Sequence, residues 1–285
     1  MSAPVIRHES ELGWWEMVRR APHPSLRPHV REYLGWFEHM AVPLCRREPP
    51  TEVVPVIINF GAPVRLFDPL DPSRWTDYDS FTTGAFDSYA LVGSAGASGG
   101  LQIDLSIIGA RLFLNRPLGE LRNRAIELED LLGRDARRLT MELYDAPTWE
   151  ARFAILDRDF AARMLAARAP SPAVMWSWRR LIESRGRVSI GALVGEVGIS
   201  QKHLITLFRE EIGLSPKTLA RVLRFGRAVR IIKRGGGNRL IEIAQDCGYY
   251  DQAHFSRDFR AFAGVTPTEL VRSIMPDGGG FSADR

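Results

Sequence analysis

The sequence predicts an α+β protein of two domains: a β-rich N-terminal barrel with a helical hairpin, and an all-α C-terminal domain with two helix-turn-helix motifs joined by a connecting helix. Three observations predict this arrangement. Short β-branched segments cluster in the first half, helical periodicity begins after them, and one phrase occurs twice near the C-terminus. The length of 285 residues agrees with about two domains.

The composition is that of an ordinary globular protein, with 45% apolar and 25% charged residues. The longest apolar stretch, around residues 53–60, is under half of the roughly 20 residues that a membrane span requires. No signal peptide is visible, and the two cysteines, Cys45 and Cys247, exclude a disulfide scaffold or a four-cysteine zinc site. These features predict a cytoplasmic, nucleoid-associated protein with no membrane partner.

The first 50 residues are rich in proline and aromatic residues, and they predict an arm with a short helix over about residues 28–39. β-Branched and apolar runs then predict short strands separated by Gly, Asp, Ser and Pro. The strand candidates are residues 53–60, 64–67, 80–86, 89–92 and 101–108. Strands at this spacing favour a small barrel over about residues 51–115.

Helical signals dominate residues 117–168 and predict two longer helices, 134–144 and 148–168. The second helix has an apolar stripe at helical spacing, formed by Phe153, Leu156, Phe160, Met164 and Ala167. The stripe packs on its own domain or forms a dimer seam. Two prolines within three residues then predict a linker. The expected divisions are a first domain over 1–168, a linker over 169–175, a second domain over 176–275 and a flexible tail over 276–285.

Positive charge is concentrated in the second domain. Residues 176–275 hold 17 Lys and Arg against nine Asp and Glu, whereas residues 1–175 hold 20 against 23. This asymmetry indicates either a polyanion partner for one domain or a solvated basic surface.

The repeated phrase decides between these readings. It runs Phe-Arg-x-x-x-Gly, then an apolar residue, a hydroxyl residue and Pro, and it starts at Phe208 and again at Phe259. Each copy follows a helix-Gly-helix pattern in which Gly198 or Gly248 allows a tight turn, and the second turn is one residue longer. Apolar residues at intervals of three and four predict one continuous connecting helix over 217–234.

The predicted second helix of each motif begins at an N-cap, Ser200 in the first motif and Asp251 in the second. Its N-terminal part is the element that enters a DNA groove in a helix-turn-helix. The outward side chains that we expect to face DNA include Lys202, His203, Ile205, Thr206, Arg209, Gln252, Ala253, Ser256, Arg257 and Arg260.

Residues 190–270 resemble the DNA-binding domain of AraC-type bacterial transcriptional regulators. The resemblance rests on Ala-Gln-x-x-Gly-Tyr-x-Asp-Gln-x-His-Phe-Ser-Arg-x-Phe-Arg at residues 244–260 and on Gly-x-Thr-Pro at 264–267. It implies a transcription regulator, more commonly an activator, with promoter DNA and RNA polymerase as partners. It also implies base-reading roles for seven of the outward residues: Lys202, Ile205, Thr206, Gln252, Ala253, Ser256 and Arg257.

The chemistry of these side chains differs between the two helices. Gln252 suits adenine and Arg257 suits guanine, because both make bidentate hydrogen bonds to base edges. The family often has a small polar residue followed by Arg where this chain has Ile205 and Thr206. We therefore expect apolar or shape readout at the first helix.

The strand-rich half resembles the cupin-like effector domains that precede this module in many AraC-type regulators. That resemblance implies a small-molecule effector or a homodimer contact. Aromatic and basic side chains supply the candidate ligand residues, which are Trp36, Phe60, Arg65, Trp75 and Arg111.

Catalysis is not indicated by the sequence. Metal-dependent cupins need clustered His and carboxylate ligands, but no His lies between Thr51 and Gln201. No Ser-His-Asp arrangement, phosphate loop or HExxH motif occurs. We expect no enzyme activity, cofactor or metal. The open alternatives are a ligand-independent DNA binder controlled by a protein partner, a cupin-type enzyme, and a repair-type alkyl acceptor that the two scattered cysteines disfavour.

Overall fold

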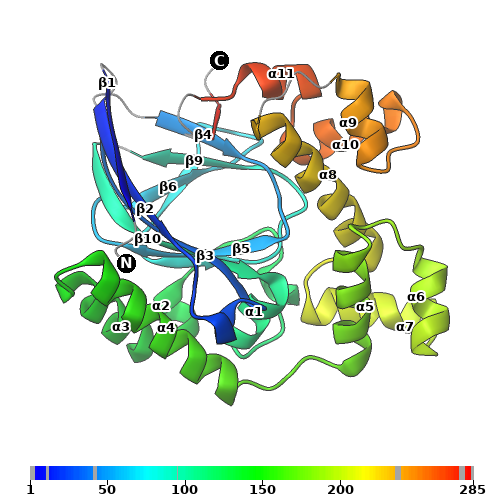
Figure 1. Ribbon diagram of the computed structural model, residues 1–285, viewed down its shortest axis with the longest axis horizontal. Helices are drawn as coiled ribbons and strands as arrows, with labels where there is room; N and C mark the ends of the chain where they lie inside the picture. Colours follow the sequence, from blue (N-terminus) through cyan, green and yellow to red (C-terminus); the bar gives the residue numbers. More distant parts are fainter. Residues whose placement is uncertain are drawn as a thin grey trace.

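Two β-sheets and eleven α-helices make up the part of the chain that the computed structural model describes: residues 4–10, 13–40, 44–94, 96–234, 239–275 and 280–283. The two sheets face each other, helices α1 to α4 lie beside the larger sheet, and helices α5 to α11 form a separate group (Figure 1). This arrangement confirms the predicted α+β architecture, although the two sheets do not join into a closed barrel.

The larger sheet has seven antiparallel strands in the order β1-β2-β3-β10-β5-β8-β11. Their bounds are Val5–Ser10 (β1), Gly13–Arg20 (β2), Val30–Met40 (β3), Ala97–Ser106 (β10), Val53–Asn59 (β5), Phe81–Thr83 (β8) and Ala125–Glu127 (β11). The smaller sheet has the order β12-β4-β9-β6-β7. Its strands are Phe281–Ser282 (β12), Leu44–Glu48 (β4), Ala90–Ser94 (β9), Val64–Phe67 (β6) and Trp75–Tyr78 (β7).

The prediction of a helix over residues 28–39 is wrong, because most of this segment belongs to the long strand β3. Strands begin at Val5, well before the barrel predicted to start near residue 51. Pairing on both sides, with β2 and β10, determines the conformation of β3. Tyr33 on this strand is fully buried, stacks on Phe153 and donates its hydroxyl to Asp157 at 3.0 Å. Tertiary contacts of this kind override local helix propensity.

Four helices pack beside the larger sheet: α1 (Ile107–Phe113), α2 (Leu128–Leu132), α3 (Arg134–Asp145) and α4 (Trp149–Ala166). The helices α3 and α4 match the predicted hairpin within a few residues. Phe153 and Phe160 on α4 are fully buried, and Phe160 stacks on Phe113 with ring centroids 4.2 Å apart. The apolar stripe of α4 therefore packs within its own domain.

The C-terminal group contains α5 (Pro172–Glu183), α6 (Ile190–Val197), α7 (Gln201–Glu211), α8 (Pro216–Arg234), α9 (Leu240–Asp246), α10 (Gln252–Ala263) and α11 (Pro267–Arg272). Pro172 lies in the first turn of α5, where proline is tolerated, so the helix begins inside the predicted linker. The predicted flexible tail is also wrong for its described part. Strand β12 pairs with β4, and Phe281 is fully buried.

We expect Phe281→Ala to lower the free energy of unfolding by about 3 kcal/mol, because it removes a buried aromatic side chain. Urea unfolding followed by fluorescence measures this loss. Leu70→Ala is the matched control, because Leu70 is 95% exposed and its truncation should change stability by less than about 0.5 kcal/mol. Equal effects of the two substitutions would mean that the C-terminal strand is not bound to the sheet.

Candidate nucleic-acid interface

The first helix-turn-helix motif consists of α6, a turn and α7. Gly198 ends α6 in the left-handed conformation with φ of 74°, which favours glycine. The Ser200 hydroxyl then accepts a hydrogen bond from the His203 amide at 3.2 Å and caps α7. Leu204 and Phe208 are fully buried and anchor α7 to the core of the domain. The local sequence therefore determines where both helices begin and end.

The opposite face of α7 is open to solvent. Lys202, His203, Thr206 and Arg209 are exposed, and Ile205 is half-buried. The Thr206 hydroxyl donates to the Lys202 carbonyl at 3.1 Å, so its hydrogen-bonding capacity is partly used within the helix. This geometry suits the predicted apolar contacts of α7 better than hydrogen bonding to a base.

The second motif consists of α9, a turn and α10. Gly248 has φ of 79°, and the Asp251 carboxylate accepts from the His254 amide at 2.6 Å. Three phenylalanines hold α10 in the core, where Phe255 and Phe259 have ring centroids 4.6 Å apart. These are Phe255, Phe259 and Phe262, which are at most 2% exposed. Both predicted N-caps and both predicted turn glycines are confirmed.

The outward face of α10 carries the predicted reading residues. Gln252, Ala253, Arg257 and Arg260 are exposed, and Ser256 is half-buried. His254 is half-buried, and its ring meets the Tyr249 ring edge-on at 5.1 Å. His254 therefore has a packing role, whereas the roles of the other residues in DNA reading stay predictions.

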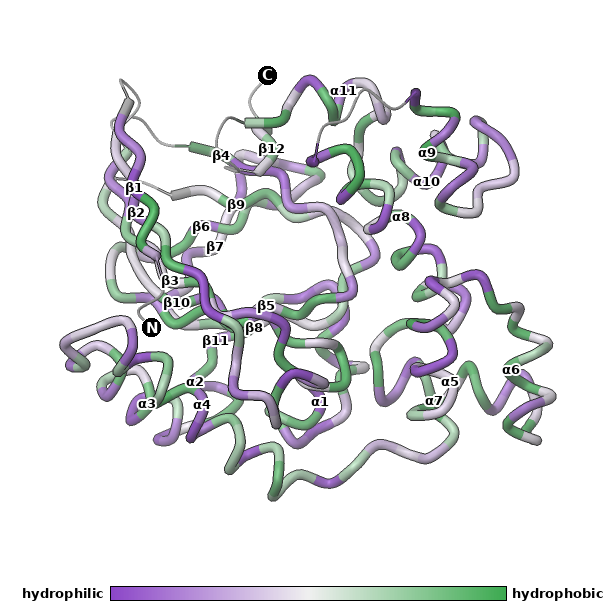
Figure 2. Tube along the Cα trace, in the orientation of Figure 1, coloured by the Kyte–Doolittle hydropathy of each residue, from purple (hydrophilic) through white to green (hydrophobic). Residues whose placement is uncertain are grey.

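Helix α8 connects the two motifs without a break, as predicted. Figure 2 shows hydrophilic and hydrophobic residues alternating along it, and Val222, Phe225 and Ile232 lie on its buried face. Two of the arginines of α8 already make hydrogen bonds within the domain. Arg221 makes two hydrogen bonds to Asp258 on α10, at 2.7 and 3.1 Å, and Arg224 donates to the Gly186 carbonyl at 2.8 Å.

The centre of the second motif is a poor environment for charged or reactive groups. Burial raises the pKa of the Cys247 thiol, which keeps it protonated and unreactive, in agreement with a core role. Burial likewise raises the pKa of the Tyr249 hydroxyl. Asp258 is 2% exposed and relies on Arg221 as its counter-charge.

The five predicted ligand residues do not converge on one site. Arg65 makes a bidentate ion pair with Asp77, at 2.7 and 2.9 Å, and its guanidinium lies 4.5 Å from the centre of the Trp75 ring. The pair lowers the pKa of Asp77. The Trp36 indole donates to the Ser98 hydroxyl at 3.4 Å, in a separate part of the domain.

The other two residues lie elsewhere. Phe60 packs against Tyr144 on α3, with ring centroids 5.9 Å apart. Arg111 is on helix α1, and it is 6% exposed. Two of its guanidinium nitrogens, Nε and Nη1, are buried without a hydrogen-bond partner among the described residues.

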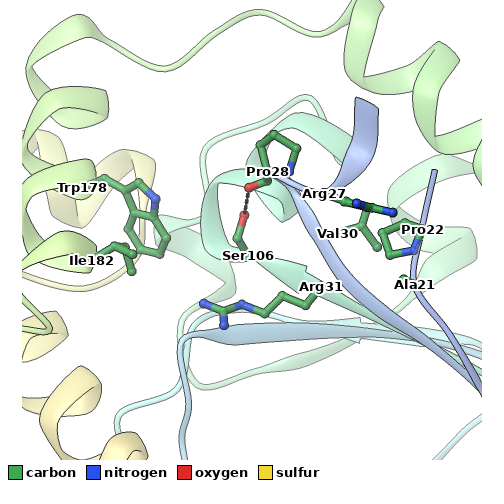
Figure 3. Close-up of a pocket in the computed structure, with 9 residues that line it drawn as sticks. All are labelled: Ala21, Pro22, Arg27, Pro28, Val30, Arg31, Ser106, Trp178 and Ile182. Carbon is green, nitrogen blue, oxygen red and sulfur yellow. Dashed lines mark hydrogen bonds between the residues drawn. The ribbon is translucent and has the colours of Figure 1, made fainter. Parts of the chain in front are cut away.

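A pocket of about 380 Å³ lies where α5 meets the N-terminal domain (Figure 3). Trp178 and Ile182 of α5 line one side, and Arg27 and Arg31 line the other. The remaining lining residues are Ala21, Pro22, Pro28, Val30 and Ser106. This pocket could not be predicted from the sequence, because the residues on its two sides are about 150 positions apart and meet only when the domains dock.

Glu52 connects the domains near this pocket. Glu52 is 2% exposed. Its Oε1 atom lies 2.7 Å from Nη1 of Arg230 on α8 and 3.4 Å from Nη2 of Arg31 on β3. Oε2 of Glu52 is buried and has no hydrogen-bond partner among the described residues. Nothing in the sequence distinguished this glutamate from the others.

Further contacts hold the C-terminal ends of both outward helices. Arg47 of β4 donates to the Ala263 carbonyl at the end of α10, at 2.8 Å. The Leu118 amide donates to the Glu211 carbonyl at the end of α7, at 3.3 Å. The N-terminal domain therefore contacts α7, α8 and α10.

Residues 193–273 match the family model of a helix-turn-helix domain. The transcriptional activator RhaR of Yersinia pseudotuberculosis is 35% identical over 75 residues, which are 26% of this chain and 26% of RhaR. The transcriptional regulator GbdR of Pseudomonas aeruginosa is 29% identical over 82 residues, or 29% of this chain and 22% of GbdR. The C-terminal domain is a helix-turn-helix domain similar to the matched segments of these two regulators. This chain spans about a quarter of the length of these curated relatives.

The comparison with solved structures matches ToxT from Vibrio cholerae, with a TM-score of 0.49 and 13% identity over 92% of this chain and 98% of ToxT. The C-terminal domain of AraT from Geobacillus stearothermophilus has a TM-score of 0.35 and 23% identity, covering 39% of this chain and 92% of that domain. In the described part of this chain, no group of three or more His, Cys, Asp or Glu side chains is placed to hold a metal ion. No described helix is long and apolar enough to span a membrane.

We expect Asp258→Asn to lower the free energy of unfolding by roughly 2 kcal/mol, because it removes a charge-assisted hydrogen-bond pair between α8 and α10. Glu196→Gln is the control, since it weakens the more exposed pair with Arg180 and should cost clearly less stability. Thermal unfolding of both variants tests the difference. If the two losses were equal, the Arg221–Asp258 pair would not brace the connecting helix.

Proposed function

We propose that the protein is a sequence-specific DNA-binding transcription regulator whose N-terminal domain controls the C-terminal domain. The observation that carries this proposal is the pair of capped helices α7 and α10, which turn exposed polar faces outward from one continuous helix. Helix α8 has 19 residues and spans roughly 28 Å. Successive major grooves on one face of DNA lie about 34 Å apart, so the two motifs suit neighbouring grooves.

The two helices have different tasks in this proposal. On α10, Gln252 and Arg257 read adenine and guanine edges, with Ala253 and Ser256 beside them. On α7, Ile205 and the Thr206 methyl group contact thymine methyl groups. Lys202 is the third base-reading residue of this helix. Exposed arginines of the domain contact phosphates and make the affinity dependent on salt. Transcription activation through RNA polymerase is the mode that we expect.

The pocket beside α5 is the candidate effector site. Arg27 and Arg31 supply positive charge on one side, and Trp178 and Ile182 supply an apolar surface on the other. These groups suit a small molecule with an anionic group and an apolar part. Such a ligand contacts both domains, so its affinity depends on how they are docked, and by linkage it shifts that docking. A homodimer in the cytoplasm is part of the same proposal, whereas catalysis is not.

Glu52 is the contact through which we propose that docking restrains DNA binding. Its carboxylate neutralises Arg230, a cation of the DNA-binding domain, and holds α8 against a domain with net negative charge. The docked state therefore competes with DNA phosphates for the basic domain. Gly226 makes the contact close, because a Cβ at that position would lie 3.2 Å from Glu52 Oε2.

Arg257→Ala should weaken binding to the cognate site by about 1–3 kcal/mol and relax discrimination at one base position. The cognate site is first selected from a random DNA pool, and affinities are then measured by fluorescence anisotropy at fixed salt. Arg74→Ala is the charge-matched control, since Arg74 is exposed on the N-terminal domain. An equal loss on cognate and random DNA would make Arg257 a phosphate contact.

Glu52→Gln should strengthen binding to the selected site several-fold, because it removes the charge that holds α8 to the N-terminal domain. Glu38→Gln is the control: it makes the same change in a buried pair with Arg46 inside the N-terminal domain. Hydrogen exchange at the start of β5 and along α8 should rise only in the Glu52 variant. Unchanged affinity and exchange would rule out this restraint.

A further inference from the structure

The turn of the second helix-turn-helix motif is one residue longer than the turn of the first, and Tyr250 is the additional residue. One residue, Ile199, separates Gly198 from the cap Ser200, whereas Tyr249 and Tyr250 separate Gly248 from the cap Asp251. The structure shows which of the two tyrosines is the addition. Tyr249 is 5% exposed and packs on Phe255 with ring centroids 5.0 Å apart, so it takes the inward position of Ile199. Tyr250 is 93% exposed.

The fold does not account for the Tyr250 side chain. No described residue makes a hydrogen bond or a ring contact with it in the structure, and its exposure means that it adds nothing to the core. Its effect is to extend an aromatic ring and a phenolic O–H donor from the turn. Single exposed aromatic residues are common on protein surfaces, so the position of Tyr250 carries the argument.

That position is at the leading end of α10. Tyr250 directly precedes the cap Asp251, and Gln252 follows as the first residue of the exposed helix face. In a helix-turn-helix bound to DNA, the N-terminal end of the second helix lies in the groove, with phosphate backbones on either side. Arg187 packs against the same turn, with its Nε atom 3.2 Å from where a Cβ of Gly248 would lie. The turn therefore combines a cation with a free hydroxyl donor.

We propose that Tyr250 positions α10 on DNA by donating its phenolic O–H to a backbone phosphate at the edge of the groove. This inference rests on the proposed DNA-binding function and adds a contact that base reading does not require. Tyrosine hydroxyls are among the side-chain groups that bind phosphate oxygens and fix the register of a protein on duplex DNA. The first motif has no counterpart, since its turn lacks the extra residue, so only α10 is anchored in this way.

Tyr250→Phe is the decisive variant, because it removes the hydroxyl and keeps the ring. Its affinity should fall about tenfold on the selected site and by the same factor on random DNA, because the variant loses a hydrogen bond to a charged group and phosphates carry no base identity. The slope of log affinity against log salt should stay unchanged, since no charge is lost. Tyr144→Phe, on α3 and 62% exposed, is the matched control and should bind as the unaltered protein does.

Ethylation interference locates the contact. One phosphate whose ethylation weakens binding of the unaltered protein should lose that effect with Tyr250→Phe, whereas the other phosphates should keep theirs. An unaltered affinity of Tyr250→Phe, or an unaltered ethylation pattern, overturns the proposal. If the unaltered protein selects no DNA from a random pool, the proposed function itself fails. That result is distinct from the failure of Tyr250 alone.

Discussion

The packing of α8 against both helix-turn-helix motifs is the constraint on which the rest of the C-terminal domain depends. Phe225 on α8 lies 4.9 Å from Phe259 and 5.2 Å from Phe262, measured between ring centroids. Arg221 adds its ion pair with Asp258 beside these rings. Aromatic contacts determine how closely the helices approach, and the charged pair restricts their rotation, because a guanidinium meets a carboxylate only in a narrow range of orientations. The spacing between α7 and α10 is therefore a property of this buried interface.

The N-terminal domain adds a second constraint on the same helices. Its contacts with the ends of α7 and α10 use backbone carbonyls, which carry no net charge. The contact of Glu52 with Arg230 is different, because both groups are charged and the carboxylate is buried. The carboxylate has two cationic partners, Arg230 on α8 at 2.7 Å and Arg31 on β3 at 3.4 Å. Separation of the domains at this point leaves it with Arg31, the more distant partner, so the strength of this contact depends on docking.

The sequence predicted the C-terminal domain more accurately than the N-terminal domain, and the reason is physical. The caps Ser200 and Asp251 act on amides three residues away, and the turn glycines act on their own backbone, so these signals are local. Strand β3 gave no such signal, because its conformation depends on pairing with β2 and β10. Long-range contacts could not be predicted from the sequence. Glu52 and Arg230, for example, are 178 positions apart, and no local pattern indicates that they meet. The outward faces could be predicted because helical periodicity determines which face is buried, and the resemblance to AraC-type regulators implied which of their residues read bases.

The ligand residues illustrate the opposite case. Arg65 was a candidate because an arginine in an apolar stretch needs an acidic partner, and the structure supplies one in Asp77 on the neighbouring strand. A single sequence cannot distinguish a partner within the chain from one on a ligand, because the chemistry of the two is the same. The pocket at the domain boundary has its own arginines, Arg27 and Arg31, at positions that look like ordinary surface residues until the two domains meet.

The helices α7 and α10 are joined by one continuous helix, but their outward faces carry different chemical groups. The Thr206 hydroxyl already bonds to a carbonyl of its own helix, so α7 offers mainly methyl groups near its centre. Helix α10 offers an amide at Gln252 and a guanidinium at Arg257, which form directional bonds to base edges. Because α8 couples the two, the position of one helix in its groove restricts where the other can lie. The DNA site that we propose is therefore asymmetric: hydrogen bonds select one groove, and shape and methyl contacts select its neighbour.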